Sequence, residues 1–358
     1  MVKEKLYPFH IGILIYMTQT GVLVLSLPRM LAETFGYNGW LALPILAAVA
    51  SLNIGLIAIV HRMGKGKSIF SILESALHKA VLFPLYAALS AVWALTGCMT
   101  AKNYVYIFQM LSFNTTHPML FKALLDILIY LLMIKGIYNI SKASTSFFWM
   151  IQWMLLLLIF FVKDFSWVRM TPFFFKGGTD VLKGGMSVFT AFLGYELSIL
   201  LFPYSDSNKK VMRAVFAGHL FTTFNYIVLS FICFGFFSFE QLKKLMYPVI
   251  DLLSYIQLPF IERVENLLFA FFLFSTVATV VMYLWAAQES MRQMMPGVPQ
   301  KLLAFIIVTA SFIVSWVPDT LVEVGKWLEY LGNASSGIAF ALPMLLILIL
   351  LIKKGAKL

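Results

Sequence analysis

The chain has 358 residues, of which 61% are hydrophobic and only 12% are charged, and its mean hydropathy is +0.88. A soluble protein needs a more polar surface, so this composition indicates a protein that crosses the lipid bilayer several times. The net charge of +11 does not indicate nucleic-acid binding, because the basic residues lie in short loops between apolar runs.

A helix of about 20 apolar residues spans a bilayer, and the sequence contains ten runs that approach this length. They lie near 9–33, 40–61, 81–111, 120–135, 144–163, 182–203, 211–237, 265–288, 301–317 and 333–352. No linker rich in Pro, Gly or Ser divides the chain, so residues 1–358 are predicted to form a single all-α membrane domain. Lys and Arg are more frequent in the loops on the side of the two termini, which predicts that both termini are cytoplasmic.

Two long loops, 164–181 and 238–264, fall on the opposite side of the predicted membrane. The second mixes apolar and charged positions, which favours a helix lying on the outer surface over a mobile gate. Lys122 is counted among the loop residues of this side. Lys102 is the only basic residue deep within a predicted span, and it either extends toward the outer interface or pairs with a carboxylate.

The first and sixth runs share an interruption near their centres. Gly21 is followed by Pro28 in the first run, and Gly194 is followed by Pro203 in the sixth. Matched interruptions in the first span of each half are typical of transporters built from two repeats of inverted topology. The spacing of five spans predicts two five-helix repeats of inverted topology, one near 9–163 and one near 182–352, with broken first and sixth helices. For a single glycine, close packing between helices would be the alternative explanation.

A broken helix exposes backbone amides at one end and carbonyls at the other, so it can hold an anion and a cation together. A free amino acid carries this pair of charges. We therefore expect the amides that follow Gly21, beginning at Val22, to face a carboxylate, and the carbonyls near Thr18 and Phe192 to face an ammonium group. The polar residues of the first interruption are candidate ligand contacts, namely Thr18, Gln19, Thr20 and Gly21.

Glu196 follows the glycine of the sixth run, in the sequence Gly194-Tyr195-Glu196. A carboxylate near the middle of a bilayer is a candidate functional group, because burying it without a partner costs several kcal/mol. It contacts the ligand directly, or it caps the second half of the broken helix, where exposed amides and the helix dipole stabilise a negative charge. The sequence leaves both roles open.

The order of the spans and several short motifs resemble a known family. The motifs are YPFHIGILIYMTQTGVLVLSLP at the start, GYE at 194–196 and IERVE at 261–265. The chain is similar to the amino acid, polyamine and organocation transporter superfamily, and within it to the B subunits of endospore germinant receptors (GerAB-like). The resemblance implies a subunit of the inner spore membrane that senses a small amino acid such as L-alanine, with a membrane A subunit and a lipoprotein C subunit as partners. A permease coupled to protons or sodium is the alternative function.

The eighth run places Ser275, Thr279 and Tyr283 along one helical face. By the same resemblance Thr279 and Tyr283 are pocket walls, and the adjacent hydroxyls of Ser275 and Thr276 are weak candidates for a sodium site. Gly97 in the third run is expected against the pocket, although small residues also allow helices to touch. Phe192, Tyr195 and Trp93 are expected to shape the pocket. No residue cluster has metal-ligand or nucleotide-binding spacing, so we expect no cofactor and no enzymatic activity.

Overall fold

The computed structural model describes residues 5–113, 115–170, 173–205, 210–256 and 264–355. Within these ranges the regular structure is helical, apart from one isolated bridge between Leu6 and Ser205. Short 3₁₀ segments are labelled η. The first half contains α1 (Pro8–Gln19), η1 (Val22–Leu25), α2 (Leu27–Phe35), η2 (Gly39–Leu41), α3 (Ala42–Met63), α4 (Ile69–Glu74), α5 (Lys79–Ser112), α6 (Pro118–Met133), α7 (Gly136–Gln152) and η3 (Trp153–Val162).

The second half repeats this helical character after a long connection. It contains η4 (Trp167–Arg169), α8 (Val181–Phe189), η5 (Thr190–Phe192), η6 (Tyr195–Tyr204), α9 (Lys210–Phe236), α10 (Phe239–Lys244), α11 (Pro248–Ser254), α12 (Val264–Met294), α13 (Gln300–Val314) and α14 (Leu321–Gly355). Local signals fix several starts: Pro8 and Pro118 stand at the first turn of α1 and α6, and the Asp180 carboxylate accepts the amides of Leu182 and Lys183 to cap α8.

Seven helical stretches of the described chain are long and apolar enough to cross a membrane. They are Gly39–Met63, Lys79–Ser112, Gly136–Val162, Val181–Tyr204, Lys210–Phe236, Glu265–Met294 and Leu321–Lys354. Each matches one of the predicted runs. The other three predicted spans correspond to shorter helices, because α6 has 16 residues, α13 has 15 and α1 ends after 12. A count of ten crossings therefore stays a prediction.

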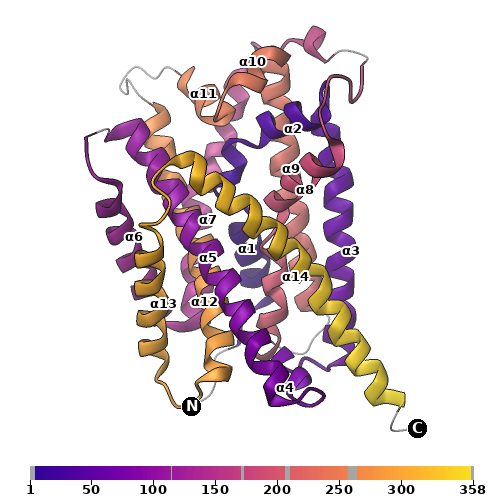
Figure 1. The fold of residues 1–358 in the computed structure, drawn as a ribbon. Helices are drawn as coiled ribbons and strands as arrows, with labels where there is room; N and C mark the ends of the chain where they lie inside the picture. Colours follow the sequence, from indigo (N-terminus) through magenta and orange to yellow (C-terminus); the bar gives the residue numbers. More distant parts are fainter. Residues whose placement is uncertain (1–4, 114, 171–172, 206–209, 257–263, 356–358) are drawn as a thin grey trace.

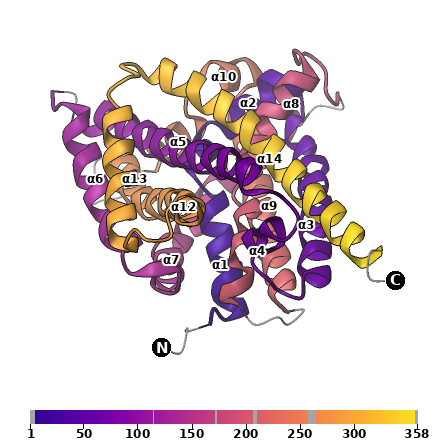
Figure 2. The same ribbon diagram turned by 60° about the horizontal axis from the view of Figure 1, so that its bottom comes forward.

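The helices run roughly side by side, with α1 in the middle of the bundle (Figures 1 and 2). Helices α6, α7 and α13 lie on one side of it and α3 on the other, and α14 crosses the bundle from the first side to the second. Helix α5 packs along α12 and crosses the bundle obliquely, as its 34 residues require: a helix of that length is about 51 Å long, more than a bilayer core needs.

The two ends of the bundle differ. At one end, which we call the loop face, lie α2, α10 and α11, and at the other, the terminus face, lie both chain termini (Figure 1). The connection before α8 packs on the loop face, since the amide of Tyr37 donates to Lys176 O at 2.9 Å and that of Thr179 to Glu33 O at 3.0 Å. The predicted surface helix of 238–264 is two short helices, α10 and α11, and residues 257–263 lie outside the described ranges.

Contacts between residues far apart in the sequence join three segments at the terminus face. The hydroxyl of Tyr204 donates to Glu289 Oε2 at 2.9 Å, and Arg292 pairs with the same oxygen at 3.2 Å. The amide of Leu6 donates to Tyr204 O at 2.8 Å. The start of the chain, the end of η6 and the end of α12 are therefore joined on this side.

Two lysines correct the sequence analysis. Lys122, which was counted as a loop residue, lies in α6 with no exposed surface, and its Nζ donates to Asp126 Oδ1 at 2.6 Å. Lys102 on α5 is 2% exposed: its Nζ donates to the carbonyl of Ser315 and lies 5.1 Å from the centre of the Tyr106 ring, so within the described residues its partners are a carbonyl and an aromatic ring. Burying a charge is costly without such partners, so both lysines are held between helices.

Candidate ligand-binding site at two helix interruptions

The first interruption lies between α1 and η1. Helix α1 ends at Gln19, Thr20 leaves the helical conformation with ψ of 62°, and Gly21 is extended. The carbonyls released here are capped by α12. Thr279 Oγ1 donates to Met17 O at 3.0 Å and to Thr18 O at 3.2 Å, and the Ser275 hydroxyl donates to Thr20 O. The hydroxyl face predicted on the eighth run therefore lies against the interruption.

The second interruption lies between η5 and η6. Leu193 is extended, and Gly194 has φ of +118°, a conformation that residues with a Cβ rarely adopt. A Cβ added at Gly194 would lie 3.0 Å from the carbonyl carbon of Thr18 and 3.1 Å from the amide of Gln19. Gly194 is required here for its backbone conformation, and also because the two interruptions touch at this point.

Helix α9 joins the two interruptions from behind. The Tyr226 hydroxyl lies 2.8 Å from Gln19 O in the first and 2.9 Å from Ala191 O in the second. The Gln19 side chain crosses between them, since its Nε2 donates to Phe192 O while its Oε1 accepts the hydroxyl of Thr222 at 3.1 Å. These side chains are buried, so the hydrogen bonds are shielded from water and fix the relative position of the two segments.

Glu196 bridges the second interruption and α12. Its Oε2 accepts the amide of Gly194 at 2.6 Å, and its Oε1 accepts the hydroxyl of Tyr283 at 3.0 Å. The residue is 4% exposed and does not line the cavity described below. Of its two predicted roles, capping agrees with this geometry, because the carboxylate satisfies backbone and phenol donors at the start of η6.

A cavity of about 670 Å³ leads from the interruptions to the loop face. Half of the twelve predicted contact residues line it, namely Thr18, Gln19, Gly21, Val22, Thr279 and Tyr283. The other half lie behind its wall, namely Thr20, Gly97, Phe192, Gly194, Tyr195 and Glu196. The lining half comes from α1, η1 and α12. The sixth run also lines the cavity, but through residues that were not predicted as contacts: Gly184, Ser187, Thr190, Ala191 and Leu193.

Gly97 and Gly21 differ in how much space surrounds them. A Cβ on Gly97 would lie 3.0 Å from Leu284 Cδ2 and 3.3 Å from Tyr283 Cβ, so this glycine allows α5 and α12 to pack closely. A Cβ on Gly21 would lie at an ordinary distance, 3.6 Å from Thr279 Oγ1, and its φ is negative. Close backbone approach therefore does not require a glycine at position 21.

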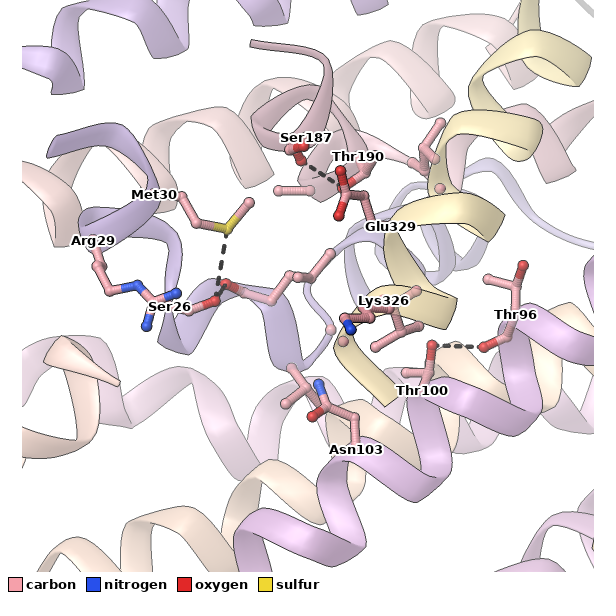
Figure 3. A pocket seen from close by; sticks show the side chains of 18 of the residues that line it. Ser26, Arg29, Met30, Thr96, Thr100, Asn103, Ser187, Thr190, Lys326 and Glu329 are labelled. Atoms are coloured by element: carbon pink, nitrogen blue, oxygen red, sulfur yellow. Dashed lines mark hydrogen bonds between the residues drawn. The ribbon is translucent and has the colours of Figure 1, made fainter. Parts of the chain in front are cut away.

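Many polar groups around the cavity were not predicted from the sequence. Figure 3 shows several of them from close by. Hydroxyls and an amide from several elements line its middle: Ser26, Thr96, Thr100, Asn103, Ser187 and Thr190. Charged groups lie on α2 and α14: Arg29, Glu33, Lys326 and Glu329. The spacing of 96, 100 and 103 places three polar residues on one helical face, a signal that the sequence contained. The residues of α8 and α14 carried no such pattern, because only the tertiary fold brings them to the cavity.

The candidate sodium ligands are engaged in hydrogen bonds. Ser275 donates to Thr20 O, and Thr276 Oγ1 donates to Phe272 O on its own helix at 3.1 Å. Among the residues that the structure describes, no three His, Cys, Asp or Glu side chains gather as a metal site would need. The cavity therefore provides mainly neutral hydrogen-bonding groups, and its four charged side chains lie toward the loop face.

Comparisons with known proteins place this geometry in a family. Residues 5–323 match the family model described as spore germination protein. The spore germination protein GerQB of Bacillus cereus is 23% identical over 319 residues, which cover 88% of this chain and 87% of that protein.

Solved transporter structures share the fold. Mhp1, a nucleobase-cation-symport-1 family transporter solved with bromovinylhydantoin bound, aligns with a TM-score of 0.68 at 12% identity, covering 95% of this chain and 78% of that chain. MhsT, solved in complex with L-phenylalanine, aligns with a TM-score of 0.63 at 14% identity, covering 98% and 89%.

At such identities the likeness concerns the fold, which is that of LeuT-like transporters. These relatives are permease-type membrane proteins, in agreement with the long apolar helices of the described chain. The resemblance to germinant receptor subunits that the sequence motifs indicated is thereby confirmed, although residues 261–263 of the IERVE motif lie outside the described ranges. The chain is an integral, multi-pass membrane protein that belongs to the spore germination protein family.

Proposed function

We propose that this chain is the germinant-sensing membrane subunit of a spore nutrient receptor and that it binds a small amino acid such as L-alanine between the two interruptions. The observation that carries the proposal is the cavity that ends at Thr18, Gly21 and Thr279, in a chain of the spore germination protein family. The structural neighbour MhsT, which binds L-phenylalanine, supports an amino acid as the ligand class.

The architecture that we propose has ten crossings in two inverted repeats, near 9–163 and 182–352. The short helices α6 and α13 would complete it, together with α1 and α2, which form one crossing interrupted at Thr20 and Gly21. Both termini lie at the same end of the bundle, as an even number of crossings requires. With the terminus face cytoplasmic, in the inner membrane of the spore, the cavity would open to the outside.

In this site the ligand carboxylate would lie toward the amides that follow Gly21, where the start of η1 favours a negative charge. Its ammonium group would lie toward the carbonyls at the end of α1 and at Phe192. Binding shifts the protein toward a second conformation only if the ligand binds that conformation more tightly. The shift would pass to a membrane A subunit and a lipoprotein C subunit, the partners that the family resemblance implies.

A matched pair of substitutions tests this site. Thr279→Val removes the hydroxyl that caps Met17 O and Thr18 O beside the cavity, whereas Thr276→Val removes a hydroxyl that bonds only within α12 and does not line the cavity. We expect spores with Thr279→Val to need about tenfold more L-alanine for half-maximal germination, since a buried hydrogen bond is worth about 1 kcal/mol and its unpaired acceptor costs more. Spores with Thr276→Val should respond normally. Equal responses in both strains would refute the proposed position of the ligand.

A permease is the second candidate function, because the solved neighbours are transporters and the cavity reaches the loop face. Uptake of labelled L-alanine into vesicles that contain the purified chain separates the two functions. Accumulation driven by a sodium or proton gradient would establish transport. Saturable binding without accumulation would establish the receptor function.

A further inference from the structure

We propose that the carboxamide of Gln19 occupies the position that the ligand ammonium takes, so that the ligand must displace this side chain from Phe192 O. The inference rests on the proposed function and adds a competing group within the same site. Gln19 was expected to contact the ligand directly. Its hydrogen bonds assign it the opposite relation to the ligand.

The carbonyls of the two interruptions do not have equivalent partners. Those of Met17, Thr18 and Thr20 are capped by short hydroxyl side chains of α12, and those of Gln19 and Ala191 by the phenol of Tyr226 on α9. Each of these donors projects from a helix that is continuous at that position. The carbonyl of Phe192 is different, because its donor is a long, unbranched side chain that belongs to an interruption itself.

The cavity wall shows the same arrangement. Ala191 and Leu193 both line the cavity, but Phe192 between them does not. Gln19 does line it, and its Nε2 donates to Phe192 O. Gln19 therefore adjoins the cavity, and its carboxamide occupies the donor position at this carbonyl. Moving the carboxamide would free an acceptor at the C-terminal end of η5, where a positive charge is favoured.

Two residues of α9 hold Gln19 in place. Thr222 donates to its Oε1 at 3.1 Å, and its Nε2 lies 3.2 Å from His219 Nδ1. His219 Nε2 lies 3.1 Å from the carbonyl of Ala47 on α3. A carbonyl only accepts, so the proton is on Nε2 and Nδ1 accepts from Gln19.

Displacement would thus break the link that runs from the first interruption through α9 to α3. An ammonium group offers three donors and a full charge where the carboxamide offers two donors and no charge, so the exchange favours the ligand. The same exchange changes the structure around the site, because the Gln19 side chain of α1 loses its contacts with Thr222 and His219 of α9.

A competing side chain predicts an effect opposite to that of an ordinary ligand contact. Shortening Gln19 to alanine should tighten L-alanine binding, because the ligand no longer has to break the carboxamide bond. One buried hydrogen bond corresponds to an affinity gain of about two- to tenfold. If Gln19 were a direct contact, the same substitution would weaken binding.

The experiment measures the Kd of L-alanine for the purified full-length chain in lipid nanodiscs, by calorimetry, for the unmodified protein, Gln19→Ala and Gln288→Ala. Gln288 is the matched control, since it is also buried and its Nε2 donates to a backbone carbonyl, that of Gln300, and it does not line the cavity. We expect a tighter Kd for Gln19→Ala and an unchanged Kd for Gln288→Ala.

A second variant guards against a folding defect in Gln19→Ala. Thr222→Val removes the donor to Gln19 Oε1 with little change of shape, so it should free the side chain and tighten binding by about twofold to fivefold. An unchanged or weaker Kd in both variants overturns the competing role, while binding by the unmodified protein leaves the proposed function intact. Absence of binding by the unmodified protein overturns both.

Discussion

Gly194 lies where the two interruptions touch and has a backbone conformation that favours glycine, and replacing it by alanine tests both requirements. Alanine at φ of +118° costs about 1–3 kcal/mol in backbone strain. The new methyl group would also lie 3.0 Å from the backbone of Thr18, and overpacking of this kind costs about 1–3 kcal/mol more. We therefore expect Gly194→Ala to lose at least about 2 kcal/mol of stability.

Gly21→Ala is the natural comparison, because Gly21 occupies the matching place in the first interruption. Its φ is −88° and its added Cβ would make ordinary contacts with Thr279. Replacing a glycine by alanine, where alanine adopts the same conformation without strain, stabilises the folded protein by about 0.4–1 kcal/mol, because the unfolded chain loses conformational entropy. The two variants should therefore shift stability in opposite directions.

The assay is thermal unfolding of the purified chain in detergent. The measured quantity is the fraction of protein that remains monodisperse after heating to each temperature. About 2 °C per kcal/mol is a fair conversion for a chain of this size, so Gly194→Ala should melt at least about 4 °C below the unmodified protein. Gly21→Ala should melt at or slightly above it. Equal melting of the two variants would refute the claim that only the second interruption needs a glycine for steric reasons.

Two further predictions concern buried polar pairs. Lys122→Met leaves Asp126 buried without its partner and should cost about 3–5 kcal/mol of stability. Adding Asp126→Leu should restore most of that stability. Similar melting temperatures of the single and double variants would contradict the pairing. Tyr283→Phe removes the donor to Glu196 and should cost about 1.5–3 kcal/mol in the unmodified background but little in Glu196→Leu, which lacks the acceptor. Additive losses in thermal unfolding would show that the two side chains act independently.

The sequence predicted the helical membrane class and the two interruptions more fully than it predicted the cavity. Glycine, polar neighbours and a later proline are local signals, and the structure gives Gly21 and Gly194 non-helical backbone angles. The hydroxyl face of 275–283 followed from helical spacing alone. Both kinds of signal depend on residues that are near each other in the chain.

The residues behind the cavity wall and those at its mouth depend instead on long-range contacts. Phe192 faces an interior amide because Gln19 reaches it from another segment, and Lys326 and Glu329 reach the cavity because α14 crosses the bundle beside α8. Lys122 was assigned to a loop because a lysine usually ends a span, and its partner Asp126, one turn further along α6, explains why it does not. No local pattern indicates the contacts of Phe192, Lys326 and Glu329, whereas the i, i+4 spacing of Lys122 and Asp126 is a local signal that the sequence contains.

The closed terminus face has a consequence for how solutes reach the protein. Tyr204, Glu289 and Arg292 join η6 to α12 on that side, and Leu6 adds the start of the chain to the same cluster. A hydrophilic reagent that cannot cross lipid should therefore modify a cysteine introduced at Thr100 or Asn103 from one side of a sealed vesicle only. In this conformation the cavity is accessible from the loop face only. Passage of a solute through the membrane would require the residues joined at the terminus face to separate.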